Sequence, residues 1–587
     1  MTTLSTFTVV GLVTCFLITH LFAADATKNE HGVPWIHTTD HWGVPFGDAA
    51  TMFYAKVEEH RTWLARQDVP AEKMEFAVGT ETSLTKVFRP KLWFRGAMTG
   101  TVQIAAARGE TEGFQLVICP IAPTERTLTR LSSDEQHKTG PLEPHTVKIN
   151  AIVPGELKGP NGAVIPADAI ELSRVAYIRT VPPQYPVMHV GEWPDPLLPM
   201  EPFEVSNPFC QPIWVDVRVP RGATPGQYTG PIRVEGPHPV VIRVELTVWP
   251  FQLPLKRSFV TMGWSLNEWF FKGGVDPFKK KVCVLLEHGL APWEACHRFS
   301  KSKNLDDHDN VFRWFQEWGV PLQSMTTDKP DPNSIEHLRK RGWLANVICI
   351  PGDEPHERDY PAFRQKVADL RKQFPGLTIA MTEDPQPGNE GMFDLWIAEP
   401  SAQRDGFVRE AIRRGTRVWW YLCQLPIHAT YPGPIWGCPG VVVDRPAVDH
   451  RVVYWLAWKY GVEGVGFWAI SAWPKGWEDW PAKPWPTNPL SEYPYSGQHN
   501  GNGFLCYPYG DRVLPSIRLK VLRDGMDDYE YLRLLKDLTR HEPTEADRRL
   551  MDVPTEVAVD LRYFNKDPNG ILSVRRELAA RIASLTR

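Results

Sequence analysis

The sequence lacks the features that mark several common protein classes. Its 587 residues carry a formal net charge of only −4, without blocks of like charge, which gives no electrostatic footprint for nucleic acid or anionic lipid. It contains no HExxH motif, Walker loop, dinucleotide-binding fingerprint or nucleophile elbow. We therefore expect no cofactor, no nucleic-acid partner and, for the mature chain, no membrane partner.

Cysteine is scarce and carries no metal-binding pattern. Of nine cysteines, Cys15 lies in an N-terminal apolar run, and the other eight are scattered without a CxxC pair. They could form disulfides in an oxidising compartment, but their spacing argues against a zinc cluster. The run Asp306-Asp-His-Asp309 lacks the glycine and terminal glutamate of a calcium hand, so we interpret it as a solvated turn. No metal site is predicted.

One long apolar run is present, at residues 9–23, and small residues follow it at Ala24 and Ala26. This pattern predicts a signal peptide over residues 1–26 and a secreted or periplasmic protein. The region before the run has no Lys or Arg, which leaves a retained anchor as the alternative. No other stretch is long and apolar enough to span a bilayer.

The length predicts several domains, and the first has the pattern of β-structure. Residues 27–254 contain alternating segments such as 213–219 and 242–248, which predict half-buried strands of an antiparallel β-sandwich. Residues 48–68 predict a helix lying on the sandwich. The proline-bounded segment 250–254 predicts a stiff hinge to the next domain.

Residues 255–514 alternate between strand-like and helix-like segments. The predicted strands are 346–350, 377–381, 395–398, 417–423 and 465–470, and the predicted helices are 361–374, 405–414 and 447–460. This alternation predicts a central (β/α)8 TIM-like barrel. Residues 515–587 predict a C-terminal helical segment, so the fold class is multidomain, with β and α/β parts.

The best candidate for chemistry is the run Pro351-Gly-Asp-Glu-Pro355, which directly follows a predicted barrel strand. Catalytic groups of such barrels lie where strands end. Gly352 and Pro355 allow the chain to bend there, so Asp353 and Glu354 can face one pocket. The alternative is that a carboxylate here caps the next helix. A cap needs only one acid, however, and two adjacent acids repel each other.

Several motifs of the chain resemble those of glycoside hydrolase family 123, the β-N-acetylgalactosaminidases. The segments that carry the resemblance are 351–355, 451–473, 516–531, 107–110 and 224–230. Segment 516–531 resembles a broad group of related bacterial proteins, so it supports the fold more than the substrate. The resemblance implies a retaining, substrate-assisted mechanism without a protein nucleophile. Asp353 would orient the 2-acetamido group, and Glu354 would act as acid and base.

Aromatic and acidic residues near predicted strand ends are further candidates for binding a glycan or glycoconjugate. The 24 Trp residues of the chain offer flat faces on which sugar rings stack, although most will be core. The candidates for substrate binding are Trp264, Tyr421, Trp468, Trp473 and Glu383. A structural ion-pair network is expected for Arg451, Arg518, Arg523, Asp527 and Asp528. Two alternatives stay open: hydrolysis of another 2-acetamido sugar on the same fold, and a non-catalytic carbohydrate-binding protein.

Overall fold

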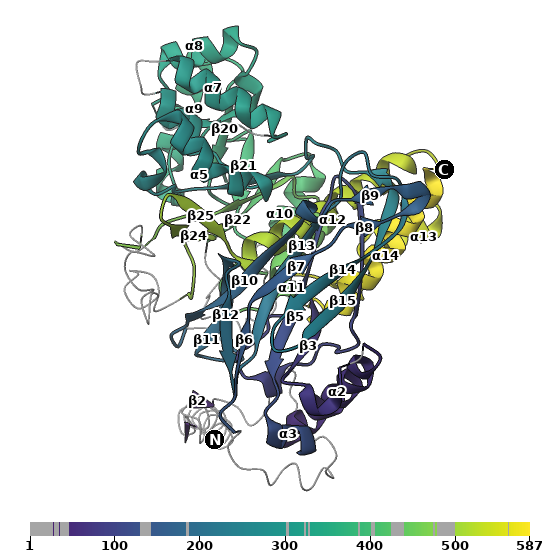
Figure 1. Ribbon diagram of the computed structural model, residues 1–587. Helices are drawn as coiled ribbons and strands as arrows, with labels where there is room; N and C mark the ends of the chain where they lie inside the picture. The colour runs from purple at the N-terminus through teal and green to yellow at the C-terminus, as the bar shows by residue number, and fades with distance from the viewer. Residues whose placement is uncertain are drawn as a thin grey trace, which may run out of the picture.

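A β-sandwich, a parallel eight-stranded sheet with surrounding helices, and a C-terminal helical segment make up the protein (Figure 1). The computed structural model describes residues 27–28, 34–35, 46–67, 69–128, 143–183, 187–300, 305–321, 324–326, 329–385, 388–400, 405–423, 439–473, 476–477, 499–561 and 563–586. The predicted signal peptide lies outside these residues. None of the helices in the described part is long and apolar enough to cross a bilayer.

The sandwich consists of two main sheets. The strands of the first, in the order in which they pair, are β11 (Glu192–Pro199), β10 (Ile170–Arg179), β13 (Gln211–Arg218), β5 (Thr111–Pro120) and β3 (Phe76–Thr82). Those of the second are β4 (Thr101–Arg108), β15 (Pro239–Gln252), β14 (Gly226–Glu235), β8 (Leu157–Lys158) and β9 (Val164–Ile165), with β7 (Ala151–Pro154) also on β14. A small sheet pairs β12 (Phe203–Ser206) with β6 (Thr146–Ile149).

The expected alternation puts one face of each main sheet into a common core. Ile213 and Val215 of β13 lie in the same apolar cluster as Ile242 and Val244 of β15. The prediction of an antiparallel sandwich is right except at one edge, where β4 pairs parallel to β15. Helix α2 (Phe46–Ala65) contacts strand β3 and the short helix η2 (Lys91–Trp93). This confirms the prediction of a helix at residues 48–68 that lies on the sandwich.

The predicted hinge at residues 250–254 is wrong. Strand β15 continues to Gln252, and Phe251 and Leu253 are buried in a core shared with the barrel helices. The outer face of β13, expected to be polar and half-exposed, is also covered: Trp214 is 1% exposed. The sandwich and the barrel therefore meet across a shared apolar core instead of a hinge.

All eight strands of the predicted barrel are present, and all pair in parallel. In chain order they are β16 (Val260–Gly263), β17 (Ala291–Pro292), β18 (Ser324–Thr326), β19 (Val347–Cys349), β20 (Thr378–Met381), β21 (Leu395–Ala398), β22 (Val418–Leu422) and β23 (Gly464–Phe467). The first strand pairs with the last, as in a barrel. Within the described residues, however, no ladder joins β17 to β18, so the ring is open at this seam.

Helices separate most of these strands along the chain. They are α5 (Val275–Glu287), α6 (Glu294–Ser300), α7 (Leu305–Glu317), α8 (Pro332–Lys340), α9 (Tyr360–Gln373), α10 (Asp405–Arg413) and α11 (Ala447–Tyr460). Figure 1 shows α7, α8 and α9 grouped at the end of the molecule farthest from α2. The interpretation of residues 306–309 as a solvated turn is wrong, because they form the first turn of α7, where Asp309 is 1% exposed.

The C-terminal segment is a hairpin followed by helices. Strands β24 (Cys506–Tyr509) and β25 (Arg512–Pro515) precede α12 (Ile517–Leu538), α13 (Glu545–Met551) and α14 (Pro568–Leu585). Ser516 caps α12 by accepting a hydrogen bond from the backbone N–H of Leu519. The helices predicted after residue 515 are therefore confirmed.

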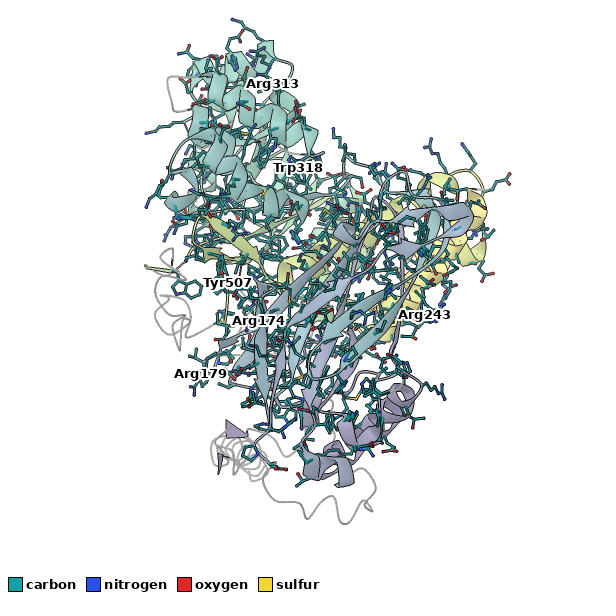
Figure 2. All side chains as sticks on the ribbon, in the orientation of Figure 1. Arg174, Arg179, Arg243, Arg313, Trp318 and Tyr507 are labelled. Atoms are coloured by element: carbon teal, nitrogen blue, oxygen red, sulfur yellow. The ribbon has the colours of Figure 1, made fainter. Side chains whose placement is uncertain are left out.

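Buried ion pairs join this segment to the sandwich. Arg518 contacts Asp195 at 2.9 Å, and Lys520 contacts Asp216 at 2.6 Å. Tyr507, which lies between the barrel and the sandwich in Figure 2, donates a 2.6 Å hydrogen bond to Asp195. Further pairs are Arg451–Asp528, Arg523–Asp524, Arg257–Asp527 and Arg575–Glu110. The predicted structural network of Arg451, Arg518, Arg523, Asp527 and Asp528 is thus confirmed.

Candidate active site

The two predicted carboxylates lie at the carboxyl end of the fourth barrel strand. Strand β19 ends at Cys349, and both Asp353 and Glu354 are exposed, between the buried residues Pro351 and Pro355. Glu354 has φ = 40°, in the left-handed region that a non-glycine residue seldom adopts. Adjacent residues of a strand point to opposite faces, but Asp353 and Glu354 lie beyond the end of β19 and are free of this alternation.

Thr382, the residue that follows β20, joins the two acids. Its hydroxyl donates a 2.6 Å hydrogen bond to Asp353 Oδ1 and accepts one of 3.2 Å from the backbone N–H of Glu354. Thr382 is 5% exposed, so its hydroxyl is fixed by the surrounding structure. The end of the neighbouring strand therefore sets the position of the carboxylate pair.

The loop that carries the acids is also held against helix α9. A Cβ atom added to Gly352 would lie 2.5 Å from Phe363 Cζ, so the chain approaches α9 too closely for any larger residue. Lys366 donates a 2.6 Å hydrogen bond to the carbonyl oxygen of Pro351. The loop is thereby attached on both sides of Gly352.

Helix capping, the alternative role for the two acids, belongs to other residues. His356 is the N-cap of the short helix η7 (Glu357–Asp359), where Asp359 completes a capping box, and Asp359 precedes α9. Asp353 instead bonds to Thr382. The two carboxylates thus do not serve as caps and are available for other contacts.

The two carboxyl groups differ in their electrostatic environment. Partial desolvation raises the pKa of Glu354, and the charge of Asp353 raises it further, while His356 opposes the change. Asp353 accepts the hydroxyl hydrogen bond of Thr382, a contact that Glu354 lacks. Two carboxyl groups in unlike environments, one of them with a raised pKa, are the arrangement needed for acid–base chemistry.

Tyr421, at the end of β22, and Trp264, directly after β16, are neighbouring aromatic residues. Burial raises the pKa of the Tyr421 hydroxyl far above its usual range, and the nearby Cys423 thiol and the charges of the two acids act in the same direction. The hydroxyl therefore keeps its proton and can donate a hydrogen bond. The ring centroid of Trp264 lies 4.9 Å from that of Tyr421. Gly466 leaves room for Trp264, because a Cβ there would lie 2.6 Å from the indole.

The other predicted binding residues have more varied positions. Trp468 follows β23 and is half-buried. Trp473 is 6% exposed, packs against Trp269, and donates its indole N–H to the carbonyl oxygen of Cys506. Glu383 accepts a 2.8 Å hydrogen bond from the backbone N–H of Asp384. The structure thus brings Tyr421 and Trp264 together, and Tyr421 is affected by the charges of the two acids. Trp473 instead belongs to the apolar core.

Two polar residues, one bonded to the acids and one beside Cys423, were not predicted from the sequence. One is Thr382, whose position directly after a predicted strand was a usable signal. The other is Asn502, which is 1% exposed and adjoins the Cys423 thiol. Its amide makes no hydrogen bond of ordinary geometry to any residue that the structure describes. Asn502 lies about 80 residues beyond Cys423 in sequence, in a turn. No local sequence pattern predicts a contact over that distance.

A separate cavity lies in the sandwich, away from these residues. It has a volume of about 570 Å³ and is lined by residues of β3, β4, β5, β14, β15 and α14, among them Glu112, Gln103 and Arg575. None of the predicted site residues lines it. The chemistry of the two acids therefore belongs to the barrel end.

Comparisons with known proteins agree with this division. Residues 290–535 match the family model of the glycoside hydrolase 123 catalytic domain, and residues 144–236 match that of the glycoside hydrolase 123 N-terminal domain. A search of curated proteins found no match.

Among solved structures, a family 123 glycoside hydrolase from Clostridium perfringens is similar in fold. Its TM-score is 0.62 at 12% identity, and the similarity covers 88% of this chain and 99% of that chain. A glycosyl hydrolase family 2 member from Bacteroides cellulosilyticus gives a TM-score of only 0.23 at 11% identity, over 67% of this chain and 46% of its own. Both domain models and the shared architecture place the chain in glycoside hydrolase family 123, and the protein is a glycosidase.

Proposed function

We propose that the protein releases terminal β-linked N-acetylgalactosamine from glycans by a retaining, substrate-assisted mechanism. The observation that carries the proposal is the pair Asp353 and Glu354, adjacent in sequence and held together by Thr382. Ordinary retaining glycosidases need a nucleophile and an acid on opposite sides of the bond, about 5 Å apart. Neighbouring carboxyl groups on one loop suit a substrate that supplies its own nucleophile.

In this mechanism the acetamido oxygen of the substrate attacks C1 and forms an oxazolinium intermediate. Asp353 accepts a hydrogen bond from the acetamido N–H and offsets the positive charge that develops on the ring. The attack is intramolecular, so it avoids the entropy cost of a bimolecular encounter. The bond from C1 to the leaving oxygen breaks with inversion, and attack by water on the intermediate inverts C1 again.

Glu354 moves the protons in both steps. Its raised pKa supports a protonated form that donates to the leaving oxygen, and the resulting carboxylate then accepts the proton of the attacking water. In this proposal Tyr421, whose hydroxyl stays protonated, donates to the acetamido oxygen, and Trp264, the ring next to it, packs against the sugar. Trp468 and Glu383 remain candidates for contacts with hydroxyl groups.

The sugar is proposed on the family resemblance. The related enzyme from Clostridium perfringens was analysed for glycolipid glycan hydrolysis, which supports a glycan or glycoconjugate substrate. The second candidate is a glucosamine-type 2-acetamido sugar, because both sugars share the acetamido group that Asp353 would bind and differ only at O4. We further propose that the protein is exported, with a mature chain beginning between Ala24 and Thr27.

The test is turnover of matched aryl β-glycosides. Replacing the acetamide by a hydroxyl removes the attacking oxygen itself, so kcat on the aryl β-galactoside should collapse even at saturation, whereas a loss of affinity alone would raise KM. A thiazoline that mimics the cyclised intermediate should inhibit far more tightly than the product sugar. Comparable kcat on both glycosides, or a covalent sugar trapped on Asp353, would overturn the mechanism. Faster turnover of the glucosaminide would change the sugar and keep the mechanism.

A further inference from the structure

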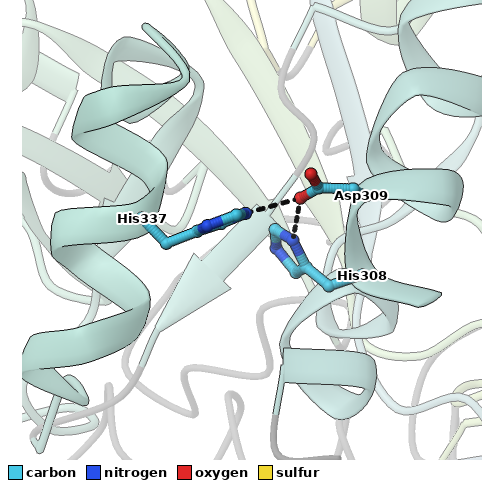
Figure 3. Close-up of side chains that lie close together, drawn as sticks. All are labelled: His308, Asp309 and His337. Carbon is cyan, nitrogen blue, oxygen red and sulfur yellow. Dashed lines mark hydrogen bonds and ion pairs between the residues drawn. The ribbon is translucent and has the colours of Figure 1, made fainter. Parts of the chain in front are cut away.

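Two helices outside the barrel sheet bring together a group of metal-ligating side chains, His308 and Asp309 of α7 and His337 of α8, which we name the α7–α8 cluster. Figure 3 shows both imidazole rings directed at one carboxylate. His337 Nε2 lies 2.7 Å and His308 Nδ1 3.3 Å from the same oxygen, Asp309 Oδ1. One ligand atom of each residue lies within 4.8 Å of the others.

The cluster is protected from solvent on one side. His308 is 2% and Asp309 1% exposed, whereas the side chain of His337 is 19% exposed. A neutral imidazole and an ionised carboxylate are the forms in which these side chains bind a metal ion.

Arg341, directly after α8, fixes the orientation of the carboxylate. Its guanidinium lies 2.6 Å from Asp309 Oδ2, on the side away from the two imidazoles. The carboxylate thus presents a single oxygen to the rings, as a monodentate metal ligand held by a second partner does. The Arg341 side chain is 46% exposed, so water screens its positive charge.

We propose that the α7–α8 cluster binds one transition-metal ion of the zinc type, through one nitrogen of each histidine and Asp309 Oδ1. Two imidazoles and a carboxylate suit zinc, and the exposed edge of His337 leaves a fourth position for water. With zinc–ligand distances of about 2.0–2.1 Å, donors of a tetrahedral site lie about 3.3 Å apart. The two nitrogen–oxygen distances in the cluster are 2.7 and 3.3 Å, and all three ligand atoms lie within 4.8 Å of one another, so small side-chain shifts would form the site. The same contacts taken as hydrogen bonds alone would satisfy Asp309 without an ion, and the experiment below separates the two.

The position of the cluster points to a structural role for the ion. Helix α7 precedes β18 and α8 follows it, and β18 is the end strand at the open seam of the barrel sheet. An ion held by both helices would restrain the unit that contains this strand. Apolar residues of both helices share one core, and Phe312 of α7 stacks on Trp343, which follows α8, with ring centroids 4.4 Å apart. The acids at the end of β19 belong to another loop, so this inference does not rest on the proposed function.

The experiment compares zinc uptake by the full-length mature chain and its variants. Each protein is treated with a chelator, dialysed and titrated with zinc chloride by calorimetry, and metal content is measured after gel filtration. His337→Ala removes a ligand at a partly exposed position, and Asp309→Asn removes the charged one. His541→Ala, at an exposed histidine between α12 and α13, is the matched control.

We expect the wild type and His541→Ala to bind one equivalent of zinc more than His337→Ala and Asp309→Asn. Zinc should raise the thermal unfolding midpoint of the wild type and leave that of His337→Ala unchanged. Cobalt bound in place of zinc should give the visible absorption of a four-coordinate ion. Equal zinc uptake by the wild type and His337→Ala, including no uptake by either, would overturn the proposal and leave a hydrogen-bonded cluster.

Discussion

The hydroxyl of Thr382 lies 2.6 Å from Asp353 Oδ1 and also accepts the backbone N–H of Glu354. A single side chain thus sets the direction of one acid and the backbone of the other. Because Thr382 is on a different strand end, the geometry of the pair depends on the packing of β19 against β20.

Thr382→Val keeps the volume of the side chain and removes this hydrogen bond. We expect kcat to fall by about tenfold or more, because hydrogen bonds to charged groups contribute about 1.5–3 kcal/mol. Thr382→Ser keeps the hydroxyl and should recover most of the loss. Steady-state kinetics on an aryl 2-acetamido glycoside provide the measurement. A valine variant with wild-type kcat would show that the loop holds the acids without Thr382.

The two acids should respond differently to the leaving group. Glu354→Gln removes the proton donor, so an activated aryl leaving group should lose less rate than a natural sugar. Asp353→Asn should slow both substrates alike, because stabilisation of the intermediate is lost whatever group departs. The comparison is kcat on a nitrophenyl glycoside and on an oligosaccharide. Wild-type turnover on both substrates would exclude the substituted residue from the reaction.

The pH profile should report the interaction between the acids. The charge of Asp353 raises the pKa of Glu354, and activity requires protonated Glu354, so activity falls as pH rises through that pKa. Asp353→Asn removes the charge, lowers the pKa, and should move the alkaline limb of the residual activity to lower pH. Glu357→Gln, at an exposed acid of the same loop region, should leave the limb in place. An unmoved limb in Asp353→Asn would contradict the coupling.

The sequence predicted the secondary structure well where a segment has one clear pattern, and wrongly where the same residues suit two kinds of structure. The strand at residues 395–398 was predicted with its observed bounds, because a parallel strand buried on both faces is a continuous apolar run. The hinge at residues 250–254 failed because Pro250 and Pro254 bound a segment that looks like a linker, whereas β15, an inner strand between β4 and β14, continues through Pro250 to Gln252. The turn at residues 306–309 failed for a similar reason: acidic residues also favour the first turn of a helix.

The sequence predicted the part of the candidate site that follows a single strand. The rule that catalytic groups follow barrel strands located Asp353 and Glu354. Their hydrogen-bond partner Thr382 follows the next strand, and Tyr421, which is affected by their charges, lies on the seventh. Which of these side chains meet depends on register and packing, which local sequence does not encode.

The buried ion pairs should make Asp528 costly to replace. It accepts hydrogen bonds from Arg451, Trp455 and Arg575, all of which are buried. Asp528→Ala would leave two buried guanidinium groups without this partner, so we expect the free energy of unfolding to fall by about 3–5 kcal/mol. Glu463→Ala breaks the exposed pair with Arg417 and should cost at most about 1 kcal/mol. Urea unfolding followed by tryptophan fluorescence measures both.

If the protein is exported, two cysteines of the sandwich should form a disulfide. The cysteines that the structure describes are free thiols, but the ladder that pairs Gln211 with Ile118 places Cys210 opposite Cys119. Burial raises the pKa of Cys119, and its hydrogen bond with Cys210 raises it further. Residues directly opposite in an antiparallel pair have Cα atoms about 4.5–5.5 Å apart, within the range of a disulfide.

We therefore expect exported protein to carry a Cys119–Cys210 disulfide, formed by exchange with an oxidised dithiol protein of that compartment. Protein made in a reducing cytoplasm should carry two thiols. Peptide mapping without reduction gives the answer, and the buried cysteines Cys296 and Cys506 should remain thiols in both samples. Alkylation of both Cys119 and Cys210 in unfolded exported protein would refute the expectation.

Strand β15 runs without interruption to Gln252, and Leu253 is buried in the core shared with the barrel helices. The catalytic part therefore cannot be treated as a portable module. A shortened chain that starts at residue 255 would leave Arg518 without Asp195 and would bare the apolar surface that Trp193 and Trp214 now cover. Evolution and protein engineering alike would have to exchange the two parts together, as one cooperative unit.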